Sequence, residues 1–240
     1  MDNGKDLIFA MGAPGSRWSG TLRVIQMYHA CINHSDDRPE RTYDRYTRDN
    51  ISNKEESVGW HRGAYWGPAH EFGQGFEDIK NNYTKESFLE ECKKPFENWD
   101  GVKIIKSHWF AYNIEILKEW FPESKLLAIQ FGSDLDTFAW WHHVGGWEIP
   151  YPHYDWYENN ERMLEQIIIE NKAINKVFQC RYDLTMEEVS NMLKIDKTIR
   201  SADDMWAMDS KLIEKHPDKS LERHLRVFNN VVKRCGIGII

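Results

Sequence analysis

The stretch "LIFAMGAPGSRWSGTLRVIQMYHACI" (residues 7–32) decides the fold. Its first part, Leu7 to Gly12, is a short apolar run bounded by charge and glycine, which predicts a buried strand. A loop of small residues follows. Ser19 to Ile32 then predicts a helix, with apolar residues on one face and Ser19 as the N-cap. A strand, a small-residue loop and a helix in this order are typical of a site that binds an anion through backbone N–H groups and the positive end of the helix.

This loop lacks the lysine of the common nucleotide-binding pattern G-x-x-x-x-G-K-(S/T). Read from Gly12, the required Gly and Lys positions hold Arg and Trp, and read from Gly15 they hold Gly and Thr. An ordinary nucleoside-triphosphate hydrolase or kinase is therefore not expected. Arg17 can still add a fixed charge and two hydrogen bonds to a phosphate or sulfate. On the loop alone, a strand-to-helix turn that binds nothing is the alternative.

Strands and helices alternate along the rest of the chain, which predicts a mostly parallel sheet with helices on both faces. The further predicted strands are 102–107, 125–130 and 177–182, and the predicted helices are 84–94, 111–121, 135–143, 157–176 and 185–193, with a mostly helical remainder. We expect one α/β domain over residues 1–240, three-layered, with four to five strands. Ligands of such sheets bind beyond the carboxyl ends of the strands. This rule places residues 12–21, Ser107–His108 and Phe131–Ser133 along one edge.

Composition excludes several classes of protein. Hydrophobic residues make up 41% of the 240 residues, as in globular chains. No run is long and apolar enough to predict a membrane span. The formal net charge of -7 argues against a nucleic-acid or acidic-membrane binder. The first residues show no signal-peptide pattern, so the expected location is cytoplasmic.

The segment "VKIIKSHWFAYNIEILKEWFPESKLLAIQ" (residues 102–130) reads strand, Lys-Ser-His, helix, Phe-Pro-x-Ser-Lys, strand. This order resembles the PAPS-dependent sulfotransferases, in which a strand ends in Lys-Thr-His, a helix follows, and Pro-x-x-Lys begins the next strand. "PGSRWSGT" (14–21) is similar to the family's Pro-(Lys/Arg)-Ser-Gly-Thr-Thr loop, which holds the 5′-phosphosulfate. "VFQCRYDLTMEEVSNMLKI" (177–195) is similar to its later Arg-Tyr-Glu-Asp-Leu segment. The resemblance implies a P-loop-like sulfotransferase architecture and transfer of a sulfuryl group from PAPS to a hydroxyl or amine.

The resemblance also implies catalytic roles, residue by residue. His108 matches the general base that takes the proton from the acceptor hydroxyl. Lys106 matches a lysine that stabilises the sulfuryl group during transfer. The family's loop lysine falls on Gly15 when the alignment is anchored on Pro14, and on Arg17 when it is anchored on the following Ser-Gly-Thr. We favour Arg17, because a cation is needed where the leaving group gains negative charge.

The donor site implied by the resemblance consists of the loop and two later residues. Tyr182 matches a tyrosine near the adenine, and Ser133 can donate a hydrogen bond. The full set of predicted donor-binding residues is Gly15, Ser16, Arg17, Trp18, Ser19, Gly20, Thr21, Ser133 and Tyr182. Sulfuryl transfer needs positioning and charge stabilisation more than covalent catalysis, and these residue types supply both.

The sequence departs from the family pattern at the end of the strand 125–130. The family has an arginine there and, about eight residues later, a serine, and both bind the 3′-phosphate. Here Phe131 or Gly132 stands at the arginine position, and the two aspartates that follow would repel a phosphate. Either another basic residue, from 41–48 or from Lys233–Arg234, binds the 3′-phosphate, or the donor is held weakly or differently.

Two segments rich in rings and glycine are candidates to bind a small-molecule or glycan acceptor. The first, residues 58–76, supplies the predicted acceptor residues Trp60, His61, Tyr65, Trp66 and His70. The second, residues 143–157, is a candidate lid. For both, a cluster that only packs the loop is the alternative. The histidines fail the spacing of a zinc site, so no metal is expected.

Two other classes of function remain open. One is a nucleotide or phosphate enzyme of the P-loop fold, such as a kinase, which ATP but not PAP, the desulfated donor, would stabilise. The other is a non-catalytic relative that binds a glycan or an aromatic ligand through its tryptophan-rich loops. The missing arginine for the 3′-phosphate is the best support for this second class.

Overall fold

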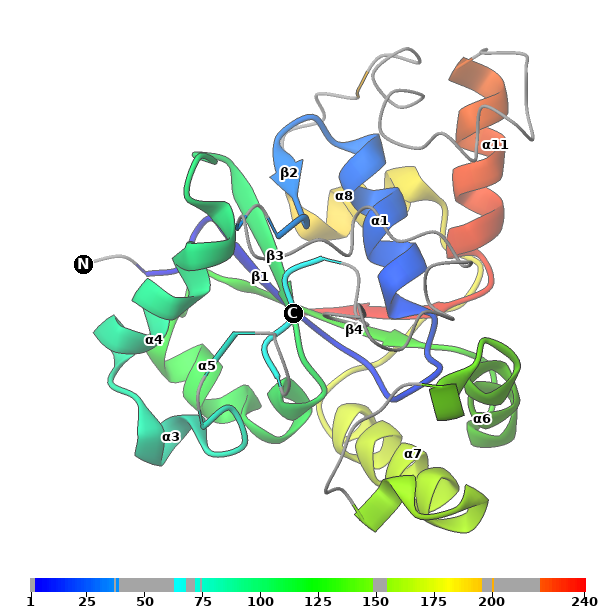
Figure 1. Cartoon of the computed structure of the whole chain (residues 1–240). Coiled ribbons are helices and arrows are strands. Elements are labelled where there is room, and N and C mark those ends of the chain that lie inside the picture. The colour runs from blue at the N-terminus through cyan, green and yellow to red at the C-terminus, as the bar shows by residue number, and fades with distance from the viewer. Residues whose placement is uncertain are drawn as a thin grey trace.

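A five-stranded sheet runs through the centre of the computed structural model, which describes residues 3–36, 38, 63–67, 72–73, 75–148, 155–195, 200 and 221–240 (Figure 1). The strand order is β2-β3-β1-β4-β5. β3 pairs in parallel with both β2 and β1, β1 pairs in parallel with β4, and β5 is antiparallel to β4. The strands are β1 (Leu7–Met11), β2 (Ile32–Asn33), β3 (Val102–Lys106), β4 (Lys125–Gln130) and β5 (Gly236–Ile239). The predicted α/β class with a mostly parallel sheet is confirmed.

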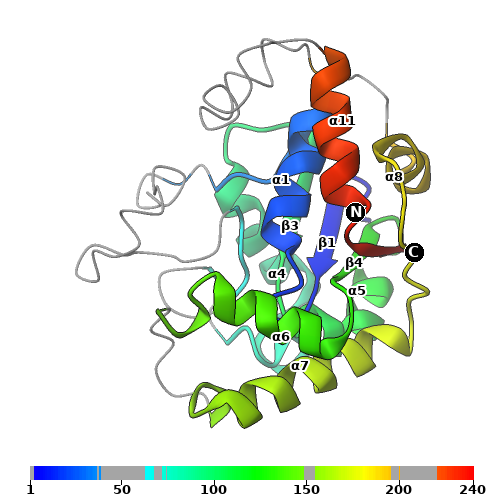
Figure 2. The ribbon, with the colours of Figure 1, turned by 90° about the vertical axis from the view of Figure 1, so that its right-hand side faces the viewer.

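Helices cover both faces of this sheet. They are α1 (Trp18–Tyr28), α3 (Ile79–Asn82), α4 (Lys85–Lys93), α5 (Ile114–Trp120), α6 (Asp134–His143), α7 (Asn160–Asn175), α8 (Met186–Leu193) and α11 (Leu221–Val232). α1 and α11 run side by side on one face, and α6 and α7 lie together beyond the end of β1 (Figure 2). None of the helices in the described ranges is long and apolar enough to cross a membrane.

Strand β1 builds two cores at once, because successive side chains of a strand point to opposite faces. Ile8 and Ala10 pack toward α1, α8 and α11. Phe9 and Met11 pack toward α4 and α5. The Phe9 ring lies 5.3 Å from the ring of Phe110, edge to face, and is fully buried. An all-apolar strand therefore fits a sheet that is covered on both sides, as the sequence predicts.

The prediction for residues 177–182 is wrong, because this segment forms no strand. It makes one isolated bridge, in which Arg181 exchanges two backbone hydrogen bonds of 2.9 Å with Ile237. The edge of β4 is occupied instead by β5, from the C-terminal stretch that the sequence assigned to mostly helical structure. A Cβ on Gly238 would lie 3.0 Å from the Cβ of Phe178, so a residue without a side chain allows this close packing.

Two helix boundaries also differ from the prediction. The helix predicted at 111–121 begins at Ile114, after a 3-10 turn at Trp109–Tyr112. The helix predicted to reach Ile32 ends at Tyr28, because Ile32 leaves to pair with Val102 of β3. Both differences arise at the ends of elements, where tertiary pairing overrides local preference.

Candidate functional site

The loop between β1 and α1 is a compact turn packed against α6. Gly15 has a φ of +84°, and a Cβ there would lie 2.2 Å from the carbonyl oxygen of Thr137. The Ser16 N–H donates to the carbonyl of Ala13 at 2.9 Å. The Ser16 hydroxyl is buried and has no hydrogen-bond partner among the residues that the structure describes. Because buried hydroxyls are normally paired, this one is suited to a ligand in the loop.

The fit of Gly15 against α6 gives a testable prediction. We expect Gly15→Ala to destabilise the fold by at least about 2 kcal/mol, because an L-residue is strained at positive φ and the methyl group would collide with Thr137. Gly20 is the matched control, since it lies in the first turn of α1 with nothing within 4 Å of a Cβ. Gly20→Ala should be neutral or stabilising by up to about 1 kcal/mol. Equal urea midpoints for the two variants would contradict this account of the loop.

Lys106 brings a positive charge to this loop from the neighbouring strand. Its Nζ donates to Ser19 Oγ at 2.7 Å and lies 5.4 Å from the centre of the Trp18 ring. The side chain is fully buried. β1 and β3 are parallel neighbours, so their carboxyl ends meet at one edge of the sheet. The loop has no lysine of its own, and β3 brings the ammonium of Lys106 next to it.

The start of α1 differs from the prediction that Ser19 is the N-cap. Ser19 is not the N-cap, and its hydroxyl accepts the hydrogen bond from Lys106. Arg17 is the N-cap residue, with a left-handed φ of 63° and no side-chain capping bond. A residue with a left-handed backbone conformation directs its side chain differently from a residue with helical φ and ψ. This conformation could not be anticipated from a spacing rule.

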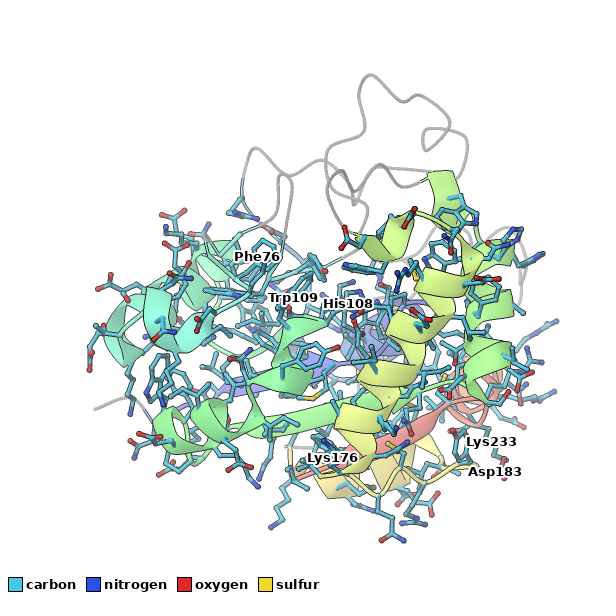
Figure 3. All side chains as sticks on the ribbon, turned by 90° about the horizontal axis from the view of Figure 1, so that it is seen from below. Phe76, His108, Trp109, Lys176, Asp183 and Lys233 are labelled. Carbon is cyan, nitrogen blue, oxygen red and sulfur yellow. The ribbon has the colours of Figure 1, made fainter. Side chains whose placement is uncertain are left out.

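His108 is 5% exposed and lies in the turn that follows β3 (Figure 3). Its ring centre is 4.3 Å from that of Trp18. Nδ1 is 2.7 Å from the carbonyl oxygen of Gly12. Because a carbonyl can only accept, the neutral ring carries its proton on Nδ1 and its lone pair on Nε2. His108 and Lys106 thus both contact the first residue of α1.

A buried carboxylate that the sequence analysis did not find lies behind this histidine. Glu170 of α7 is 1% exposed, and its Oε2 is 3.1 Å from His108 Nδ1. The signal was present in the sequence, because Glu170 falls at helical spacing between Ile167 and Ile174 on the core face of α7. A glutamate on an apolar helix face usually has a specific partner.

The guanidinium of Arg17 lies between two aromatic rings. Its Cζ is 4.2 Å from the centre of the Trp140 ring and 4.9 Å from that of Phe131. Burial lowers the pKa of Arg17, and the positive charge of Arg234 acts in the same direction. Arg17 is therefore directed toward α6 and the end of β4, and it approaches Arg234 at the end of α11.

The two aspartates expected to repel a phosphate have partners of their own. Asp136 accepts from the Ser133 hydroxyl at 2.7 Å, and Ser133 caps α6 in return. These hydrogen bonds from Ser133 lower the pKa of Asp136. Asp134 accepts from the side chain of Asn171 at 2.7 Å. The Ser133 hydroxyl is thus used in capping, and Asp134 is held toward α7.

A cavity of about 370 Å³ joins many of the predicted residues. This volume lies within the usual range of ligand pockets. Its described lining comprises Pro14, Gly15, Arg17, Trp18, Ser19, Gly20, Val24, His108, Trp140, Trp141, Val144, Tyr157 and Val231. Four indole or phenol rings and four valine or proline side chains suit a planar ligand, and Arg17, Ser19 and His108 supply polar contacts.

Four predicted donor-site residues are not in the described lining of this cavity, namely Ser16 and Thr21, which are fully buried, and Ser133 and Tyr182. Tyr182 is 45% exposed, and its hydroxyl donates to the carbonyl of Gly132 at 3.3 Å. It lies beside Gly236, where a Cβ would come within 2.6 Å of its ring. Tyr182 therefore lies where β4 ends and β5 begins, next to Gly132, the residue that follows Phe131.

The predicted acceptor residues lie in different places. Trp66 packs in the core, with its ring 4.6 Å from that of Phe88. Tyr65 is also buried, 5.9 Å from the rings of both His108 and Trp18. Tyr65 and Trp66 extend the sheet locally, since the Trp66 N–H donates to the carbonyl of Lys106 at 2.9 Å. Trp60, His61 and His70 lie outside the described residues, as do Arg41 to Arg48.

In the candidate lid, Val144 and Tyr157 line the cavity, and residues 149–154 are outside the described part of the chain. Trp147 is 37% exposed, and its ring lies 4.8 Å from that of Trp141. The site combines a tight loop between β1 and α1, the buried ammonium of Lys106, the ring of His108 and a ring-lined cavity. Comparisons with family models, with curated proteins and with solved structures find no match to this chain.

Proposed function

We propose that this protein transfers a sulfuryl group from PAPS to a hydroxyl or amine. One observation carries the proposal: Lys106 and His108, from the end of β3, both contact Trp18 at the start of α1. A buried ammonium and a buried imidazole therefore flank the loop that is suited to an anion. This combination fits a reaction in which negative charge moves onto a leaving phosphate while an acceptor loses a proton.

In the proposed reaction, the acceptor oxygen or nitrogen attacks sulfur as the bond between sulfur and the 5′-phosphate oxygen breaks. His108 takes the acceptor's proton at Nε2 and keeps its own proton on Nδ1, bonded to the carbonyl of Gly12. Lys106 stabilises the negative charge during transfer. The buried Ser16 hydroxyl and the N-terminal N–H groups of α1 provide further hydrogen-bond donors for the anion.

We assign Arg17 to the 3′-phosphate rather than to the leaving group. Its guanidinium lies over the ring of Phe131, the residue that occupies the family's arginine position, and Arg234 is close by. Arg17 can thus place a positive charge at the end of β4, where this chain has Phe131 in place of the family's arginine. The partners of Asp134 and Asp136 reduce the repulsion that the sequence suggested.

Titration calorimetry with PAP and with adenosine 5′-monophosphate, which lacks the 3′-phosphate, tests both assignments. We expect PAP to bind about 10- to 100-fold more tightly, the range that a charge-assisted contact provides. Arg17→Gln should remove this difference and leave the binding of the monophosphate unchanged. Arg162→Gln, on the exposed face of α7, is the control.

Other outcomes would point elsewhere. No binding of PAP at millimolar concentration contradicts the proposed donor. Thermal stabilisation by ATP but not by PAP would favour a phosphoryl-transfer enzyme. PAP binding that Arg17→Gln leaves intact would keep the donor and remove Arg17 from the 3′-phosphate site.

A further inference from the structure

A charged group stands directly behind the proposed base. Glu170 Oε2 lies 3.1 Å from His108 Nδ1, and both side chains are at least nine-tenths buried. Glu170 Oε1 accepts from the side-chain amide of Gln166 at 2.7 Å. A buried carboxylate is costly unless it is paired and hydrogen-bonded, and this one has both kinds of contact. The proposed reaction uses Nε2 of the same ring, which leaves the carboxylate without an assigned task.

We propose that Glu170 is a positioning residue that acts through His108 and stabilises the imidazolium formed during transfer. This inference rests on the proposed function. The proton leaves the acceptor and binds Nε2, Nδ1 keeps its proton, and no proton is transferred to Glu170. The ring gains a positive charge in a buried place, where an adjacent negative charge has a large effect.

The carbonyl of Gly12 and the carboxylate of Glu170 have different tasks. The carbonyl is closer to Nδ1, at 2.7 Å, and is sufficient to select the tautomer. It is neutral, however, and does not compensate a charge that appears only in the reaction. Glu170 supplies that charge, so its effect should appear in turnover rather than in binding of the donor.

The surroundings keep this carboxylate in place. Met163, Ile167 and Ile174 bury the same face of α7. The amide of Gln166 donates to both Glu170 and the Tyr112 hydroxyl, the latter at 3.2 Å. Burial, and then the negative charge of Glu170, raises the pKa of Tyr112, so the phenol stays protonated. A chain of polar contacts thus runs from Tyr112 to His108.

The test compares Glu170→Gln with Glu165→Gln, an exposed glutamate on the same helix that pairs with Arg162. The measurement is release of PAP from PAPS, with 4-nitrophenol or water as acceptor. In Glu170→Gln we expect this release to slow by about 10- to 100-fold, because the variant loses only part of what a general base contributes. The dissociation constant for PAP should stay within about twofold. Glu170→Asp, which keeps the charge, should fall between this variant and the wild type. Turnover of Glu170→Gln equal to that of Glu165→Gln overturns the inference.

A spectroscopic measurement separates this inference from the proposed function. Proton NMR of the protein with labelled histidine should show a low-field Nδ1–H signal that is lost in His108→Asn. We expect this signal to move upfield in Glu170→Gln and to stay in place in Glu165→Gln, because a charged acceptor makes the stronger hydrogen bond. An unmoved signal in Glu170→Gln overturns the pairing. If the wild-type protein binds no PAP, the proposed function fails, while the NMR result still decides the pairing.

Discussion

His108→Ala is expected to lower the rate of sulfuryl transfer by about 100- to 10,000-fold, the range that a general base contributes. The reason is that no other histidine is in the described lining of the cavity: His142 and His143 are exposed on α6, His29 bonds to Ser190, and His34 packs against Gly63. Binding of PAP should change little, because Nε2 acts on the acceptor. The measurements are PAP release from PAPS and calorimetric titration with PAP.

Loss of folding has to be separated from loss of the base in this experiment. Removing the imidazole leaves Glu170 buried without a contact that it has in the wild type, which can cost about 3–5 kcal/mol. His108→Asn is therefore the second variant, because its amide can still donate toward the carbonyl of Gly12 but has no basic nitrogen. His142→Ala, an exposed histidine outside the cavity lining, is the control. Wild-type turnover in His108→Asn would remove His108 from the mechanism.

The sequence was sufficient to locate the edge of the sheet at which the site lies. Leu7 to Gly12 had to be a buried strand, since its residues are all apolar or small, and the position of Lys106 and His108 after a second such strand put them at the same edge. Parallel pairing of β1 with β3 then brings them to the loop. These inferences depend on the apolar pattern of each strand and on the order of strands and helices along the chain, and both can be read from the sequence.

What could not be predicted depends on long-range contacts. Strand β5 consists of glycine and isoleucine, and its role appears only when Gly238 packs against Phe178. Glu170 is 62 residues from His108 along the chain, so no local spacing connects them. The left-handed φ of Arg17 directs its guanidinium to Phe131 and Trp140, and a non-glycine residue in this conformation is rare.

The other large effect is expected for Lys106→Met, in which stability and turnover should change in opposite directions. The methionine fills the space of the buried stem but lacks the ammonium that contacts Ser19 and the Trp18 ring. Loss of a preorganised charge at the transferring group should slow the reaction by about 100- to 1,000-fold.

The fold itself should not suffer, because a fully buried ammonium carries a desolvation cost that methionine does not. We expect a melting temperature equal to that of the wild type or about 2–4 °C higher, which corresponds to about 1 kcal/mol in a chain of this size. Lys103→Met is the matched control: it lies on the same strand, half-buried, and donates to the carbonyl of Gly101 away from the loop. Its turnover should stay near the wild-type value.

A melting temperature of Lys106→Met well below the wild type would make Lys106 a structural residue, whereas unchanged turnover would exclude it from charge stabilisation. If Lys106→Met is slower and more stable than the wild type, the buried charge of Lys106 serves function and not stability.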